Sequence, residues 1–154
     1  MQKLGSLPLR DIPVATTRFS LESFINISTG KTIALDSISG KQCIAFCGIA
    51  NPRSFSGMLE NAGVIIHELL SFPDHWRYTA DDFAIITGST EGCAPKLLIT
   101  TEKAAVKIRH HLPPSLEVLA ARMVIDWDFG WNFIEEQLMS VISNSKCGFN
   151  STVN

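Results

Sequence analysis

The sequence has no strong excess of charge of either sign. Its 154 residues include 18% charged side chains and carry a formal net charge of -2. Binding to nucleic acid through its phosphates needs a basic field, and a disordered acidic tail needs a run of carboxylates. Since neither is present, nucleic acid is not an expected partner. The hydrophobic fraction of 45% is sufficient for one compact domain with a sizeable core.

The cysteines do not form a CxxC pair. They stand at positions Cys43, Cys47, Cys93 and Cys147. Tetrahedral metal sites require closely spaced Cys or His pairs, so we expect no metal site. Cys43 and Cys47 have the even spacing of one strand face within an apolar run, where cysteine behaves as a small buried hydrophobe. Scattered cysteines favour a reducing, cytoplasmic setting.

No segment reaches the ~18 consecutive apolar residues of a membrane-spanning helix. The longest apolar stretches are interrupted by His67 and by the charges near Asp126. The chain also opens without the basic and apolar regions of a signal peptide. These absences predict a soluble chain.

The sequence also lacks the phosphate-binding loop GxxxxGK[ST]. Gly-Lys pairs occur at Gly30-Lys31 and Gly40-Lys41, and Thr32 follows the first pair. Neither pair has the upstream glycine that the motif requires, and a hairpin turn explains Gly30 better than a nucleotide site. The chain alone is therefore not expected to bind ATP tightly.

The first part of the chain predicts a hairpin after an irregular start. Residues 1–17 mix Gly, Pro and polar residues without a period, which indicates an irregular lead-in. Within residues 18–40, two β-prone stretches at 24–27 and 32–35 are separated by turn residues. At the other end of the chain, residues 144–154 are expected to form a flexible tail.

Between residues 41 and 143, apolar strands alternate with helices. Strands are predicted at 43–47, 64–66, 96–100 and the end of 116–125, and helices at 52–62, 79–88, 102–111 and 131–142. This alternation predicts an α/β fold with a mostly parallel, Rossmann-like sheet of about four strands, covered by helices on both faces. Functional loops are expected at the carboxyl ends of the strands.

Three of these loops carry distinctive residues. They read Gly48-Ile49-Ala50-Asn51-Pro52 with Phe55, then Phe72-Pro73-Asp74-His75, then Thr100-Thr101-Glu102-Lys103 followed by Ala105-Val106-Lys107. Gly48 allows close backbone approach, which suits a ligand phosphate, but a tight turn with Asn51 as helix cap explains the same residues. Both interpretations remain open at this stage.

The other two loops also have two interpretations each. Pro73 stiffens the loop that presents Asp74 and His75, and such a pair can share a proton or simply cap a helix. Lys103 could meet a phosphate with Glu102 ordering it, or both could belong to a capped helix start. Beside His75, an aromatic Trp76 suits either the apolar part of a ligand or core packing.

In this order and spacing, the three loops resemble the C-terminal domain of tetraacyldisaccharide 4'-kinase, the lipid A 4'-kinase, from about Pro13 to about Ile142. The resemblance implies the second half of a two-domain, P-loop-kinase-type protein, with the hairpin of residues 18–40 linking the domains. It implies transfer of the ATP γ-phosphate to the 4'-hydroxyl of a tetraacyldisaccharide 1-phosphate in lipid A biosynthesis. ATP and Mg would bind an N-terminal P-loop domain that this sequence lacks.

The same resemblance implies a setting and residue roles. The setting is the cytoplasmic side of the inner membrane of a Gram-negative bacterium, contacted through the missing half. His75 matches the histidine that, with an aspartate of the N-terminal domain, activates the sugar hydroxyl, and Asp74 adjoins it as a second catalytic candidate. Four residues would lie near substrate or phosphate: Gly48, Asn51, Glu102 and Lys103. The family commonly reads Thr-Glu-Lys-Asp where this chain has Ala104, so the third loop has lost a carboxylate.

Two other functions are compatible with the sequence. A non-catalytic α/β binding module could keep the fold without the chemistry, because fold alone does not fix function. A subunit of a heteromer could work with another chain that carries the phosphate loop. An upstream reading frame that encodes GxxxxGK[ST] would favour a kinase fragment or a heteromer over the module.

Overall fold

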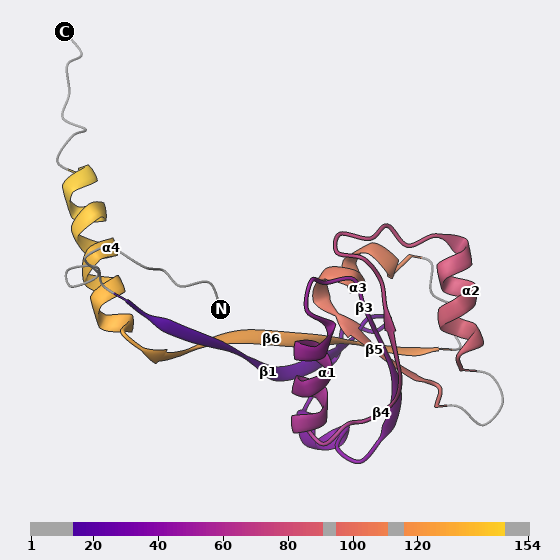
Figure 1. Cartoon of the computed structure of the whole chain (residues 1–154). Helices are drawn as coiled ribbons and strands as arrows, with labels where there is room; N and C mark the ends of the chain where they lie inside the picture. Colours follow the sequence, from indigo (N-terminus) through magenta and orange to yellow (C-terminus); the bar gives the residue numbers. More distant parts are fainter. Residues whose placement is uncertain (1–13, 91–94, 111–115, 147–154) are drawn as a thin grey trace, which may run out of the picture. The chain divides into compact units, whose positions relative to one another are not determined.

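The computed structural model describes residues 14–90, 95–110 and 116–146 (Figure 1). The chain divides into two compact units, one formed by Ser20–Val124 and the other by Met1–Phe19 with Ile125–Asn154. We call the first unit the sheet domain. The described part of the second, residues 14–19 and 125–146, is called the terminal unit.

Among the described residues, strands form one sheet in the order β2-β1-β6-β5-β3-β4. The strands are β1 (Thr16–Asn26), β2 (Thr32–Ile33), β3 (Gln42–Cys47), β4 (Ile65–Ser71), β5 (Leu97–Thr101) and β6 (Glu117–Phe129). β3 is parallel to both β4 and β5, and β5 is parallel to β6. These four parallel strands confirm the predicted α/β fold. The predicted hairpin is also confirmed, since β1 and β2 are antiparallel with Phe24 opposite Ile33.

The helices are α1 (Pro52–Asn61), α2 (Ala80–Gly88), α3 (Glu102–Ile108) and α4 (Trp131–Lys146), with a short 3-10 helix, η2, at Leu35–Ser37. Pro52 opens α1, where its missing N–H costs nothing. Thr79 caps α2 by accepting a hydrogen bond from the amide of Asp82 at 3.4 Å, as the sequence predicts. No helix within the described ranges is long and apolar enough to cross a bilayer.

Several predicted boundaries are wrong. β1 begins at Thr16, inside the predicted irregular lead-in, and β6 continues to Phe129. These two strands are neighbours in the sheet, so the backbone of each is hydrogen-bonded to the other. Such pairing lengthens both strands and leaves no mark in the sequence of either one. α3 ends at Ile108, while α4 runs through the first three residues of the predicted tail. α4 belongs to the terminal unit.

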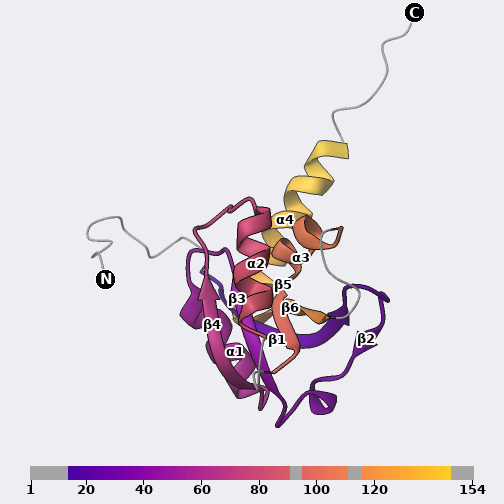
Figure 2. The ribbon, with the colours of Figure 1, turned by 90° about the vertical axis from the view of Figure 1, so that its right-hand side faces the viewer.

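The core of the sheet domain lies on both faces of the sheet, because successive residues of a strand point in opposite directions (Figure 2). On one face, Phe55 of α1 belongs to the same buried cluster as Cys43 and Cys47 of β3. On the other face, Ile86 of α2 and Ile108 of α3 belong to a cluster with Phe46. Helices therefore cover both faces, as predicted.

The two cysteines of β3 are structural. Both are buried and carry free thiols, which confirms the prediction of small buried hydrophobes. Burial raises the pKa of Cys43 to about 12, so its thiol is neutral and unreactive at ordinary pH. Cys93 and Cys147 lie outside the described residues.

Candidate functional site

The loops after β3, β4 and β5 meet at one edge of the sheet, because the carboxyl ends of parallel strands lie together. The amide of Phe72 donates to the carbonyl of Cys47 at 2.8 Å, which joins the first two loops at their roots. A Cβ added to Gly48 would lie 3.1 Å from the Pro73 carbonyl oxygen and 3.4 Å from the Trp76 Cβ. Gly48 is therefore needed for close packing between these loops.

Asp74 and Lys103 connect the second loop to the third. Lys103 Nζ donates to Asp74 Oδ1 at 2.9 Å, although the two residues are 29 positions apart in the sequence. The amide of His75 donates to the same oxygen at 2.9 Å. The hydrogen bond from Lys103 is the main reason that the pKa of the Asp74 carboxyl is lowered. The hydrogen bond from the His75 amide and the charges of His75 and Lys103 lower it further, against an opposing effect of burial. Asp74 is therefore an anionic anchor for the loop at neutral pH.

His75 is presented to solvent on this anchored loop. Its side chain is 79% exposed, and its Nε2 lies 3.7 Å from Asp74 Oδ2, beyond hydrogen-bonding distance. Its φ is 60°, which places it alone among the described non-glycine residues in the left-handed region. A residue with a Cβ adopts this conformation at a cost of roughly 1 kcal/mol or more, and such strain is common at functional sites. The backbone conformation of His75 is thus fixed, and its imidazole is accessible to a ligand or to another protein.

Trp76 stabilises the loop through contacts with α2 and with Phe72. Its indole Nε1 donates to Asp82 Oδ2 at 2.9 Å, and its ring stacks on Phe72 at a centroid distance of 6.4 Å. Lys107 Nζ of α3 donates to the Trp76 carbonyl at 2.9 Å. These contacts support a packing role for Trp76 rather than a role as a surface for a ligand. The sequence interpretation gave no role to Lys107, whose position one turn after Lys103 on the same helix was the available signal.

Asp82 joins the loop to α2. Its Oδ2 accepts hydrogen bonds from the Thr79 amide at 2.7 Å and from the Thr79 hydroxyl at 2.9 Å, in addition to the Trp76 bond. With the Thr79 side chain capping the Asp82 amide, the pair forms a reciprocal capping box. The sequence did not predict the hydrogen bond that the Trp76 indole donates to Asp82. The spacing Thr-x-x-Asp was the only local signal.

Asn51 and Glu102 do not join the His75 loop. Asn51 Oδ1 accepts the amide of Ser54 at 3.1 Å, so its side chain caps α1. The Glu102 carboxylate accepts a bond from Arg122 Nε of β6 at 3.3 Å. Ala104, where the family commonly has a carboxylate, is buried at 4% exposure. The structure thus brings Gly48, the Asp74–His75 pair and Lys103 together, and it gives Asn51 and Glu102 other partners.

The pH dependence of stability tests the role of Asp82. Burial opposes ionisation of this carboxyl, but the bonds from the Thr79 amide, the Trp76 indole and the Thr79 hydroxyl outweigh burial and lower its pKa. A folded-state pKa below the unfolded value of about 3.9 stabilises the protein above that pH. We expect the free energy of unfolding, measured by urea denaturation, to fall as the pH drops from about 4 through the lowered folded pKa.

Replacement of Asp82 by Asn should make that dependence shallower and cost about 1 kcal/mol at neutral pH. The matched control is Asp81→Asn on the exposed neighbour, which forms none of these bonds. An Asp82→Asn variant with the pH dependence of the wild type would show that the carboxylate does not hold the loop.

At the carboxyl ends of these strands, the exposed imidazole of His75 lies beside the ion pair of Asp74 and Lys103. A histidine in this setting can accept, donate or orient a proton of a bound hydroxyl. The sequence has no GxxxxGK[ST] loop, and no cluster of three His, Cys, Asp or Glu able to hold a metal ion occurs among residues that the structure describes.

Comparisons with known proteins agree on one family. Residues 2–143 match the family model described as tetraacyldisaccharide-1-P 4'-kinase. The tetraacyldisaccharide 4'-kinase of Syntrophobacter fumaroxidans is 35% identical over 120 residues, which cover 78% of this chain and 30% of that protein. The enzyme of the same name from Halothermothrix orenii is 41% identical over 103 residues, which cover 67% of this chain and 25% of that protein.

A solved structure has the same fold. It is LpxK from Aquifex aeolicus in complex with ATP, with a TM-score of 0.50 and 20% sequence identity. The match covers 84% of this chain and 35% of that one. The chain therefore spans less than a third of the length of the two curated relatives.

Proposed function

The chain belongs to the tetraacyldisaccharide-1-P 4'-kinase family, and we propose that it is the C-terminal domain of such a kinase. The full protein would transfer the ATP γ-phosphate to the 4'-hydroxyl of a tetraacyldisaccharide 1-phosphate. It would work in the cytoplasm at the inner membrane, where that acylated substrate resides. ATP and Mg would be held by a P-loop half that is absent from this chain.

The observation that carries the proposal is the exposed imidazole of His75 on a rigid loop at the carboxyl edge of the parallel sheet. The Lys103–Asp74 bond of 2.9 Å and the Lys107–Trp76 bond of 2.9 Å fix the loop to α3. In the proposed enzyme, His75 orients the acceptor hydroxyl, or takes its proton, together with a carboxylate from the other half. Asp74 is then a positioning residue, because Lys103 already neutralises it and it makes no hydrogen bond to the imidazole.

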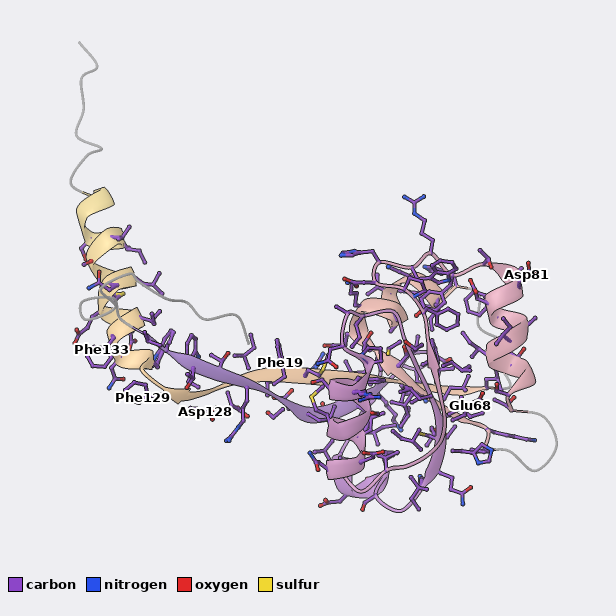
Figure 3. The ribbon with its side chains drawn as sticks, viewed as in Figure 1. Phe19, Glu68, Asp81, Asp128, Phe129 and Phe133 are labelled. Carbon is purple, nitrogen blue, oxygen red and sulfur yellow. The ribbon has the colours of Figure 1, made fainter. Side chains whose placement is uncertain are left out.

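The terminal unit is the surface we propose for contact with the P-loop half. Its large apolar side chains are unusually exposed for a stable surface in water, and such patches mark interaction sites. Figure 3 labels three of them, Phe19, Phe129 and Phe133. The exposed apolar residues of this unit are Val14, Phe19, Ile125, Trp127, Phe129, Trp131, Phe133, Leu138, Met139, Val141 and Ile142.

Reconstitution from two parts tests the proposal. We expect the chain alone to bind Mg·ATP no more tightly than the millimolar range, because it lacks a cradle of backbone amides with a lysine. Mixed with the separately produced P-loop half of a family member, it should form a complex. That complex should phosphorylate a tetraacyldisaccharide 1-phosphate in a radiolabel assay that neither part supports alone.

Two variants make the test specific to the terminal unit. Phe133→Asp, at a side chain 53% exposed in that unit, should weaken the complex. Ile85→Asp, at a side chain 54% exposed on α2, should leave the complex intact. Micromolar Mg·ATP affinity of the chain alone, or a complex without kinase activity, would contradict the proposal and favour a binding module.

A further inference from the structure

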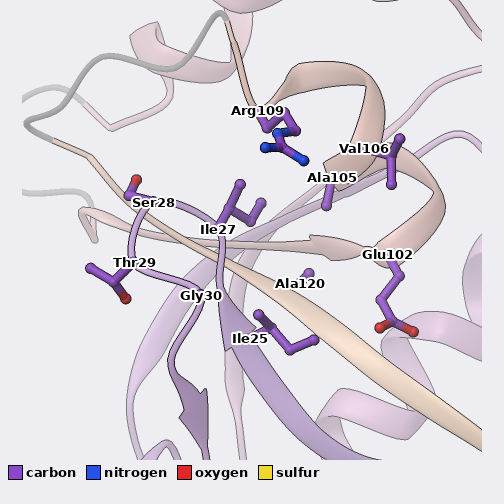
Figure 4. Close-up of a pocket in the computed structure, with 10 residues that line it drawn as sticks. All are labelled: Ile25, Ile27, Ser28, Thr29, Gly30, Glu102, Ala105, Val106, Arg109 and Ala120. Carbon is purple, nitrogen blue, oxygen red and sulfur yellow. The ribbon is translucent and has the colours of Figure 1, made fainter.

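A groove separate from the His75 loop lies along α3, on the face of the sheet that α3 covers. Its volume is about 430 Å³, and it is lined by side chains of the β1–β2 hairpin, α3 and β6. Figure 4 shows Arg109 at one end and Glu102 at the other, with Ala105 of α3 between them and Ile25 and Ile27 opposite this helix. The groove exists because Ala105 and Ala120 are small and because α3 is only seven residues long.

The two charged ends of the groove are not equivalent. Glu102 is neutralised by Arg122, whose Nε lies 3.3 Å from the carboxylate. The guanidinium of Arg109 forms no ion pair or hydrogen bond with any residue in the described ranges. Among the described residues, nothing compensates the positive charge that Arg109 brings to the groove, and the hydroxyl-bearing residues Ser28 and Thr29 are also in its lining.

Between its ends the lining is apolar. Ile25 comes from β1 and Ile27 from the turn that follows it, Ala105 and Val106 from α3, and Ala120 from β6. A purely polar anion at Arg109 would leave this surface in contact with water, and an uncharged hydrocarbon would leave the guanidinium without a partner. A ligand that satisfies both has an acidic head and a hydrocarbon tail.

We infer that this groove binds a single-chain anionic amphiphile, with its acidic head on Arg109 and its hydrocarbon along Ile25, Ile27 and Val106. The site lies away from the His75 loop and contains none of the proposed catalytic residues. The inference therefore does not depend on the kinase assignment, and it can be tested on the chain alone.

The direct test is calorimetric titration of the chain with decyl phosphate below its critical micelle concentration. Inorganic phosphate and decanol are the two half-ligands, and each should bind at least tenfold more weakly than decyl phosphate. Hexyl, octyl and decyl phosphate should bind with rising affinity. The expected gain is roughly fourfold for each methylene group buried in the groove, until the groove is filled.

Variants locate the ligand within the groove. Arg109→Gln should weaken decyl phosphate binding about tenfold, because it removes a charged hydrogen-bond donor from the acidic head. Arg53→Gln, at an exposed arginine of α1, should leave it unchanged. Val106→Glu, at a side chain 71% exposed and therefore safe for folding, should weaken binding by placing a charged carboxylate against the hydrocarbon.

Three outcomes would overturn the inference. The first is decanol binding as tightly as decyl phosphate, which would mean that Arg109 plays no part. The second is inorganic phosphate binding as tightly, which would reduce the groove to an anion site. The third is an unchanged affinity in Arg109→Gln and Val106→Glu, which would place the amphiphile elsewhere.

Discussion

Turnover should fall by roughly two to four powers of ten when His75 is replaced by alanine in the kinase restored from both halves. The reason is that a positioned acid–base group acts on the acceptor hydroxyl, whereas the phosphate loop and metal act on the nucleotide. ATP affinity should therefore remain nearly unchanged. Steady-state kinetics with the lipid acceptor, together with nucleotide titration of the same complex, measure both quantities.

Controls for the His75→Ala result come from the same domain. Asp74→Asn should reduce turnover less, because Asp74 anchors the loop through Lys103 without bonding the imidazole. His67→Ala, on the exposed face of β4, should have almost no effect. Wild-type turnover in His75→Ala, or a loss that thermal denaturation explains entirely, would remove His75 from the mechanism.

Replacement of Phe46 by alanine is expected to lower the free energy of unfolding by about 3–5 kcal/mol. Phe46 is fully buried in β3, and its ring meets Tyr78 edge-on at a centroid distance of 6.1 Å. The substitution removes buried apolar surface and leaves a cavity beneath the loop that carries His75. Urea denaturation followed by tryptophan fluorescence measures the change.

The matched control for Phe46→Ala is Val106→Ala, at a side chain 71% exposed on α3. Its effect on unfolding should stay within about 0.5 kcal/mol, as for most surface substitutions. A cost for Phe46→Ala below 1 kcal/mol would show that the face of the sheet covered by α2 and α3 is not packed as described.

The parallel core was predictable because its signals are local. β3 and β5 are mostly apolar, which is typical of strands buried on both faces, and Pro52 and Thr79 mark helix starts directly. The lengths of β1 and β6 were not predictable in this way. Each strand extends by pairing with the other, and that pairing joins parts of the chain about a hundred residues apart.

The candidate site was predicted in position but not in its internal contacts. Loops at the carboxyl ends of parallel strands must converge, so the neighbourhood of Gly48, Asp74 and Lys103 follows from the topology. Which carboxylate pairs with which cation does not follow from it. Lys103 bonds Asp74, whereas the adjacent Glu102 turns to Arg122, because successive residues of a helix point in different directions. The left-handed φ of His75 has no sequence signal, since it depends on the contacts around the loop.

The order of the sheet also bears on aggregation. A sheet edge presents unpaired amides and carbonyls that can template a strand of another molecule. One edge here is β2, which is only two residues long, and it pairs with Phe24 and Ile25 of the longer β1. The other edge is β4, longer but interrupted at its centre by the exposed pair His67 and Glu68. Charged and polar residues on an edge strand discourage edge-to-edge pairing, so His67 and Glu68 work against fibre-like growth from β4.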